Sequence, residues 1–165
     1  MNLGVTTMFS SRALAAFFLA GVLPAAEPSG FALWKAESLK QHAQALSKSV
    51  RPDRSSRETL ADYQSHRFRL LYRDGDGYPE QHDNEIDVVI VQDGEATLLL
   101  GGKIVNPEKN PEANNGVGEW KGTRIDGGER HALAAGDVVH IPAKIPHSFL
   151  VAKGKHISYV LLKIK

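Results

Sequence analysis

Cysteine is absent from this sequence. The absence excludes disulfide bonds, thiolate chemistry and zinc sites that are built on cysteine ligands. A chain without disulfides must be stabilised by its apolar core. A closed β-barrel can provide such a core, even in an exported protein. The length of 165 residues fits one domain with one such core.

Blocks of lysine and arginine are also missing, and basic residues are not interleaved with aromatic ones. Because nucleic-acid binding relies on such basic surfaces, we expect no nucleic-acid partner. The chain has 20 basic and 19 acidic residues, and Arg12 is the only charged residue before Glu27. Residues 27–165 therefore carry 19 charges of each sign and have no net charge.

The first 26 residues are almost uncharged but include an apolar run over residues 13–23. Arg12 precedes this run and Ala25 and Ala26 follow it, which is the order of a secretory signal peptide. The run is short for a membrane span. We predict that residues 1–26 are removed, and that the mature chain is periplasmic or secreted without membrane contact. A lipid-facing anchor and a buried helix are the alternatives, and the cleavage position stays open.

Residues 27–63 are predicted to form a short helical N-terminal arm. Leu39, Ala43 and Leu46 recur at spacings of four and three residues, which is the apolar stripe of a one-faced helix. Pro52 and its polar neighbours then break the helix. We expect the arm to pack against the rest of the chain or against a neighbouring subunit.

Residues 64–165 have the pattern of an all-β domain, with short β-rich segments between glycine, aspartate and proline turns. The expected strands are residues 66–73, 86–91, 96–100, 122–126, 138–141, 148–152 and 157–164. Asp93-Gly94 is expected to form a tight hairpin turn between two of them. Many short strands of this kind favour an antiparallel sandwich or barrel.

Four side chains stand out as candidate metal ligands. Glu80 and His82 are two residues apart, so on a strand their side chains share a face. Asp87 adds a second carboxylate five residues later, and His147 follows a proline-framed turn far along the chain. Such a mixed nitrogen and oxygen set suits a divalent ion of Mn, Fe, Zn or Ni rather than copper–thiolate chemistry.

The segment around these first three residues resembles the first motif of the cupin superfamily. That motif runs Gly, His-x-His, three or four residues, Glu, six residues and Gly. Here Glu80-x-His82 is followed by four residues, Asp87, six residues and Gly94. The spacing agrees, while Glu80 replaces the first histidine and Asp87 replaces the glutamate.

The second motif of the same superfamily runs Gly, five residues, Pro-x-Gly, two residues and His. Here Gly136 is followed by five residues, Pro142-x-Lys144, two residues and His147, with Lys144 in place of the glycine. The sequence is also similar to small exported single-domain bacterial cupins. That similarity rests on Glu80-x-His82, Gly94-Glu95-Ala96-Thr97, Gly101-Gly102, Gly127-Gly128, His131 and the stretch from Gly136 to His147.

The resemblance implies a cupin-type antiparallel β-barrel, or jelly-roll, over residues 64–165, with the helical arm before it. It implies that His82, His147, Glu80 and Asp87 hold a divalent metal ion. It also implies a homodimer, because cupin barrels often pair through edge strands and arms. Isomerase, lyase or dioxygenase chemistry on a small polar molecule is the activity expected from it.

Three roles remain open for such a site. In a metalloenzyme, a carboxylate of Glu80 or Asp87 that does not bind metal would be the general base, with a pKa raised by burial. In a binding module, the barrel would hold and release a small ligand unchanged. A purely structural polar network is the third role. In the first two cases, His140 and Tyr78 are predicted to line the ligand pocket.

Overall fold

The computed structural model describes residues 27–110 and 118–165, so the predicted signal peptide over residues 1–26 lies outside the described residues. Residues 27–31 form a turn in which the Phe31 N–H donates to the Pro28 carbonyl at 3.1 Å. Residues 32–165 form a separate compact unit. Within the described ranges, no helix is both long and apolar enough to cross a membrane.

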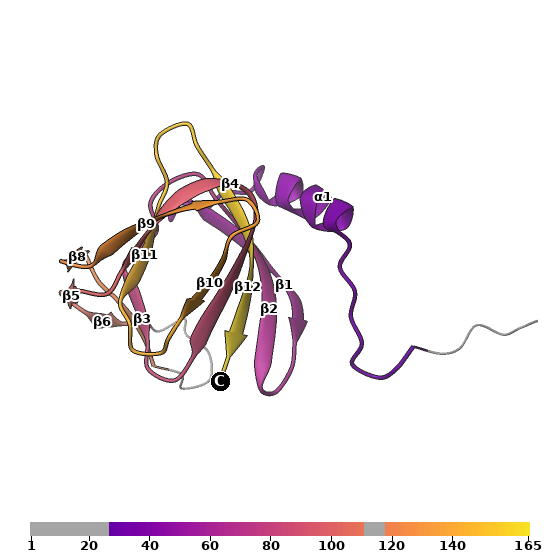
Figure 1. The fold of residues 1–165 in the computed structure, drawn as a ribbon, viewed down its shortest axis with the longest axis horizontal. Coiled ribbons are helices and arrows are strands. Elements are labelled where there is room, and N and C mark those ends of the chain that lie inside the picture. The colour runs from indigo at the N-terminus through magenta and orange to yellow at the C-terminus, as the bar shows by residue number, and fades with distance from the viewer. Residues whose placement is uncertain (1–26, 111–117) are drawn as a thin grey trace, which may run out of the picture. The chain divides into compact units, whose positions relative to one another are not determined.

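Within its described residues, the compact unit contains one helix and twelve strands (Figure 1). They are α1 (Ala36–Leu46), β1 (Ser55–Asp62), β2 (His66–Arg73), β3 (Glu80–His82), β4 (Ile86–Leu100), β5 (Lys103–Val105), β6 (Glu108–Lys109), β7 (Glu119–Lys121), β8 (Arg124–Asp126), β9 (Glu129–Ala134), β10 (Val138–Ile141), β11 (His147–Leu150) and β12 (Ile157–Ile164).

The strands form a curled antiparallel sheet in the order β1-β2-β12-β4-β11-β3-β7-β6, and β9 and β10 also pair with β4. β5 and β8 form a separate two-stranded sheet. The long strand β4 connects the two halves, because β12 and β10 pair with its first part and β9 and β11 pair with its second part. The predicted all-β fold is confirmed, and the architecture is that of a cupin-type jelly-roll barrel with one short helix (Figure 1).

Strand β4 corrects one prediction, because Asp93-Gly94 is not a hairpin turn. The strand continues through both residues from Ile86 to Leu100 and bends at a β-bulge opposite Ser158 and Tyr159 of β12. Gly94 has a φ of +80°, a left-handed conformation that glycine adopts without steric cost. A bulge and a tight turn both use glycine in this conformation, so the dipeptide does not distinguish them.

The inner face of the sheet holds the main apolar core, which joins β2, β4, β9, β10, β11 and β12. Its buried members are Leu71, Val89, Val91, Leu98, Leu133, Ile141, Phe149, Val151, Ile157, Tyr159 and Leu161. Phe149 and Tyr159 stack with their ring centroids 4.9 Å apart. Because each such buried side chain contributes about 1.5–3 kcal/mol, this core is the main stabilising feature of the barrel.

A second core lies on the opposite face of the same sheet, where α1 packs. Leu39 of α1 is buried with Leu70 of β2 and Val160 of β12. The expected helical stripe therefore exists, but it covers only residues 36–46 of the arm. Residues 55–62 form β1, an edge strand paired with β2, so the sheet begins earlier than residue 64. Its polar composition, SSRETLAD, suits an edge strand and hides the strand period.

Candidate metal centre

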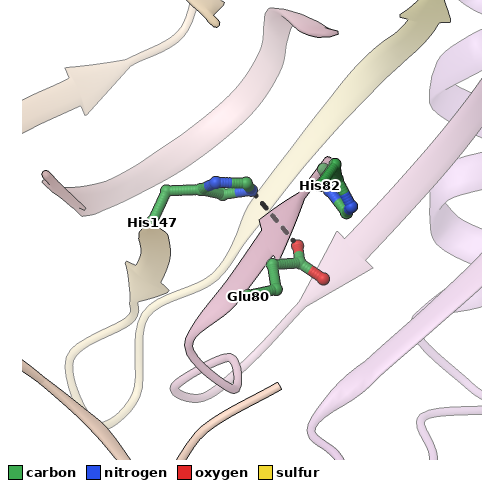
Figure 2. A group of neighbouring side chains, drawn as sticks. All are labelled: Glu80, His82 and His147. Atoms are coloured by element: carbon green, nitrogen blue, oxygen red, sulfur yellow. Dashed lines mark ion pairs between the residues drawn. The ribbon is translucent and has the colours of Figure 1, made fainter. Parts of the chain in front are cut away.

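Two strands bring three of the candidate ligands together inside the barrel. Glu80 and His82 lie at the two ends of β3, and His147 begins β11, where it pairs with Glu80. Figure 2 shows these three side chains pointing toward one another. Each offers one ligand atom, and these atoms all lie within 4.8 Å of one another, so the group could hold a metal ion. His82 and His147 are buried, whereas the Glu80 side chain is 24% exposed.

Asp87 lies beside this group. Its Oδ2 atom is 3.3 Å from Nε2 of His82 and 3.6 Å from Nε2 of His147. Glu80 Oε1 is 3.5 Å from the same His147 nitrogen. The structure therefore brings all four residues predicted as ligands to one place, although Asp87 is not part of the three-residue group described above.

The tautomer of the neutral His147 ring is set by its backbone contact. Its Nδ1 atom lies 3.0 Å from the Ile145 carbonyl oxygen, which can only accept a hydrogen bond. Nδ1 therefore donates, and in the neutral ring the lone pair is on Nε2. Nε2 is buried and has no hydrogen-bond partner among residues 27–110 and 118–165. A nitrogen lone pair directed at two carboxylates is the donor that a divalent cation requires.

The turn before His147 contains an unusual backbone conformation. Lys144 has a φ of +66°, in the left-handed region that favours glycine. It stands where the cupin motif has its glycine, and its N–H donates to the His82 carbonyl at 2.6 Å. A left-handed backbone thus occurs at the position where the resemblance places a glycine, and the turn is bonded directly to the strand that carries His82.

Lys163 of β12 is a member of the site that the motifs do not indicate. Its buried ammonium nitrogen lies 2.9 Å from Nε2 of His82 and 2.9 Å from Oδ1 of Asp87. Glu85 Oε2 is 3.6 Å away. Because an ammonium group only donates, Nε2 of His82 accepts this hydrogen bond. One feature of the sequence could have revealed Lys163: it is the only charged residue in the apolar strand ISYVLLKI.

The charges of the site stabilise one another. Burial lowers the pKa of Lys163, but the charges of Asp87 and Glu80 outweigh this effect and raise it. Burial likewise lowers the pKa of His147, and its interactions with Glu80 and Asp87 raise it overall. In the absence of a metal ion, the Lys163 ammonium group thus supplies positive charge beside the buried carboxylates.

A raised pKa, predicted for whichever of Glu80 and Asp87 does not bind metal, is found for neither carboxyl group. Burial alone would raise the pKa of Glu80, but its interaction with His147 across the 3.5 Å contact brings that pKa well below the usual range. For Asp87, burial is outweighed by the contact with His82 and the charge of Lys163, which lower the pKa to about 2. Nearby cations rather than burial decide both values, so the two groups are carboxylates and weak proton acceptors.

A cavity of about 80 Å³ opens beside this centre. The charged side chains that line it are Arg57, Arg67, Arg69, Arg73, Lys121, Lys163, Asp53, Glu80, Glu85 and Glu119. Tyr78 also lines it, in the place expected from the sequence. His140 does not, because it alternates on β10 with the buried Ile141 and is therefore exposed on the other face of the strand.

No protein-family model matches the sequence, and no curated protein does. Solved structures with a similar fold do exist. A cupin 2 conserved barrel domain protein from Rhodopseudomonas palustris is 18% identical, with 67% of this chain and 60% of that chain covered and a TM-score of 0.46. KdgF from Halomonas sp. is 18% identical, with 70% and 83% covered and a TM-score of 0.49.

The DMSP lyase DddQ from Ruegeria pomeroyi is 17% identical, with 68% of this chain and 48% of that chain covered and a TM-score of 0.48. The chain spans between 48% and 65% of the first three solved structures that it matches. At these identities and TM-scores, nothing about the chemistry of this site follows from them. The fold assignment rests on the strand pairing of this chain.

Proposed function

We propose that this cupin-type barrel binds a divalent metal ion through Glu80, His82 and His147 and acts on a small polar molecule in the adjacent cavity. Isomerase, lyase or dioxygenase chemistry is the proposed reaction type. We also propose that the mature chain is exported and forms a homodimer, as the sequence predicts. The metal proposal is the part that the described side chains support directly.

The observation that carries the metal proposal is the environment of Nε2 in His147. This atom is buried and makes no hydrogen bond within the described residues, and carboxylate oxygens of Glu80 and Asp87 lie at ion-pair distances of 3.5 and 3.6 Å. In the neutral ring this nitrogen is a buried acceptor without a donor, and a bound cation would satisfy it and both carboxylates together.

The residues of the proposed centre have different roles. A divalent ion held by the two imidazoles and Glu80 would polarise a ligand oxygen or activate a water molecule. Ile145 holds the His147 ring in the required tautomer through its carbonyl. Lys163 keeps Asp87 ionised beside the ligands. Burial of His82, His147 and Asp87 strengthens each of these interactions.

A non-catalytic binding module is the second candidate, and the carboxyl pKa values favour it. An enzyme that moves protons at neutral pH needs an acceptor with a pKa near that range. Glu80 and Asp87 instead have lowered pKa values. A metal-loaded barrel that binds a ligand and releases it unchanged would need no such acceptor.

Metal content by mass spectrometry tests the proposed centre. The full chain would be purified without chelator and without a nickel column, beside His82→Ala and His147→Ala. The matched control is His131→Ala, because His131 is exposed on β9. We expect one first-row metal per chain in the wild type and in the control, and loss of the metal in both site variants. A wild-type protein that also refuses added Mn, Fe, Zn and Ni would contradict the proposal.

The enzyme and the binding module are then separated by the fate of the ligand. The metal-loaded chain would be incubated with small sugars and organic acids, and their NMR spectra followed over time. Conversion that is lost in His147→Ala supports the enzyme. Saturable binding of a molecule that is recovered unchanged supports the binding module.

A further inference from the structure

Strand β2 directs a row of arginines toward the interior of the barrel. In the segment HRFRLLYR, Arg67, Arg69, Leu71 and Arg73 alternate with the outer residues and therefore share one face. Arg69 is opposite Leu161 of β12 in the strand register. Because Leu161 and Leu71 belong to the inner core, this face is the inner one. On an ordinary half-buried strand, the polar side chains of such an alternating pattern would face solvent. Here the arginines face the cavity instead.

These arginines differ in how well they are paired. Arg73 donates from Nε to the Tyr159 hydroxyl at 3.2 Å. Arg67 has only long contacts, 3.6 Å to Asp62 and 3.9 Å to Glu85, and its Nε atom is buried without a partner among the described residues. Arg69 makes neither a hydrogen bond nor an ion pair through its side chain within the described part of the chain, and its Nε is buried as well.

The surroundings of Arg69 oppose its charge. Burial lowers the pKa of its guanidinium group, and repulsion by Arg67 and Arg57 lowers it further, while Glu85 and Glu119 act in the opposite direction. A partly buried guanidinium group without a partner among the described residues destabilises the folded state, and an apolar side chain of similar length would cover the same wall at lower cost. The arrangement becomes favourable when an anion enters the cavity.

The charge balance of the cavity wall agrees with this. Six cationic side chains line it against four acidic ones, which leaves an excess of two positive charges. Arginine is the residue best suited to bind planar or tetrahedral oxyanions, because its donors form a fixed fork. Glu80 lines the same cavity, so a ligand held there by the arginines would lie beside the proposed metal ligands.

We propose that Arg69, with Arg57 and Arg67 beside it, binds the carboxylate or phosphate group of a small molecule in the cavity next to Glu80, His82 and His147. This inference deepens the proposed function, since it specifies that the small polar molecule is an anion. It rests on the proposed function in one respect, namely that a metal ion is bound beside the ligand. The arginines themselves need no metal ion to bind an oxyanion.

Isothermal titration calorimetry on the full chain tests the proposal, with inorganic phosphate and malonate as probes and glycerol as the uncharged control. The two anions distinguish a phosphate from a carboxylate preference. Each titration is run with excess chelator and again after metal addition. The variant is Arg69→Met, and the matched control is Arg130→Met, which removes an exposed arginine on β9, away from the cavity.

We expect saturable binding of at least one anion to the wild type and to Arg130→Met, and no binding of glycerol. In Arg69→Met, affinity should fall about tenfold or more, the loss typical of one charge-assisted contact. Thermal melting of Arg69→Met should remain cooperative, because the substitution removes a repelled charge. Equal affinity in Arg69→Met and wild type, or no saturable binding of either anion, would overturn the proposal.

The two proposals fail in different ways. A chain that binds anion under chelator but holds no metal retains the arginine subsite and loses the metal centre. Conversely, a chain that holds one metal ion per molecule but binds neither anion would support the metal centre and contradict the arginine subsite. If Arg69→Met does not fold, Arg67→Met and Arg57→Met replace it, and unchanged affinity in both would count against the subsite.

Discussion

At the scale of single residues, Lys163 determines the state of the centre when no metal is bound. Its ammonium group occupies the space between His82 and Asp87 and uses the nitrogen lone pair that a metal ion would need. A cation built into the chain thus competes with a cation from solution. The competition costs metal affinity, but it stabilises the empty barrel by neutralising buried carboxylates.

Replacing this lysine should therefore have opposite effects on the empty and the loaded protein. In Lys163→Met we expect metal to bind about tenfold more tightly, because a repelling charge close to the ion is removed. The metal-free variant should lose about 3 kcal/mol of unfolding free energy, since Asp87 remains buried without its partner. Competition with a fluorescent chelator and urea unfolding measure the two effects.

Lys155→Met is the control, because Lys155 forms an exposed ion pair with Glu95. We expect its metal affinity and stability to stay near those of the wild type. Weaker metal binding in Lys163→Met would show that the ammonium group assists the metal rather than competing with it.

Lys144 gives a second prediction at this scale. Its left-handed backbone costs about 1–2 kcal/mol for a residue with a Cβ atom, and glycine avoids this cost. The larger entropy of glycine in the unfolded chain offsets part of this gain, so Lys144→Gly should stabilise the protein by about 0.5–1 kcal/mol. Lys144→Ala keeps the Cβ atom and should be nearly neutral. Equilibrium urea unfolding compares the three proteins, and equal stability of the glycine and alanine variants would contradict the explanation.

The sequence predicts the candidate ligands better than their surroundings. Glu80 and His82 can be placed together because strand alternation and motif spacing are local properties. Lys163 and Arg69 cannot, because their contacts depend on which strands become neighbours and which face turns inward. The direction of the carboxyl pKa shifts fails for the same reason: it is set by Lys163 and His147, which come from distant strands.

At the scale of elements, the bulge in β4 determines how the two halves of the sheet meet. Gly94 lies so close to β12 that a Cβ atom would be 2.1 Å from the His156 carbonyl oxygen. The adjacent backbones thus approach each other in a way that only glycine permits. The sequence marks this position as special, but it does not show whether the chain turns back there or continues.

Two alanine substitutions at matched backbone angles test this account. Gly94 and Gly154 both have a φ of +80°, but a Cβ atom on Gly154 would have nothing within 4 Å. Gly154→Ala should cost about 1–2 kcal/mol from the backbone alone. Gly94→Ala should cost at least about 2 kcal/mol more, because β4 and β12 must separate. Urea unfolding measures both, and equal costs would exclude the steric explanation.

At the scale of the whole molecule, the barrel combines a stabilising apolar core with a buried cluster of charges. Both lie on the inner face of one sheet, so binding at the cluster should stabilise the entire fold. If the proposed centre takes up metal, its binding free energy adds to the unfolding free energy, by about 2.7 kcal/mol when the free metal is at 100 times its dissociation constant.

We therefore expect metal removal to lower the thermal midpoint of the chain by about 5–10 °C, the change typical of such an energy in a protein of this size. Differential scanning calorimetry before and after dialysis against chelator measures the shift. His147→Ala should show no shift under the same treatment. If neither chelator nor added metal changes the thermal midpoint of the wild type, metal binding does not stabilise the fold and the prediction is wrong.

The strand register of β12 has a consequence for accurate folding. β2 and β4 pair with its two edges, and its side chains alternate between the charged centre and the apolar face under α1. A slip by a single residue would move Lys163 onto that apolar face and bring Leu162 to the carboxylates. Both changes would destabilise the misaligned barrel. The charges of the centre therefore also favour the correct strand register over a shifted one.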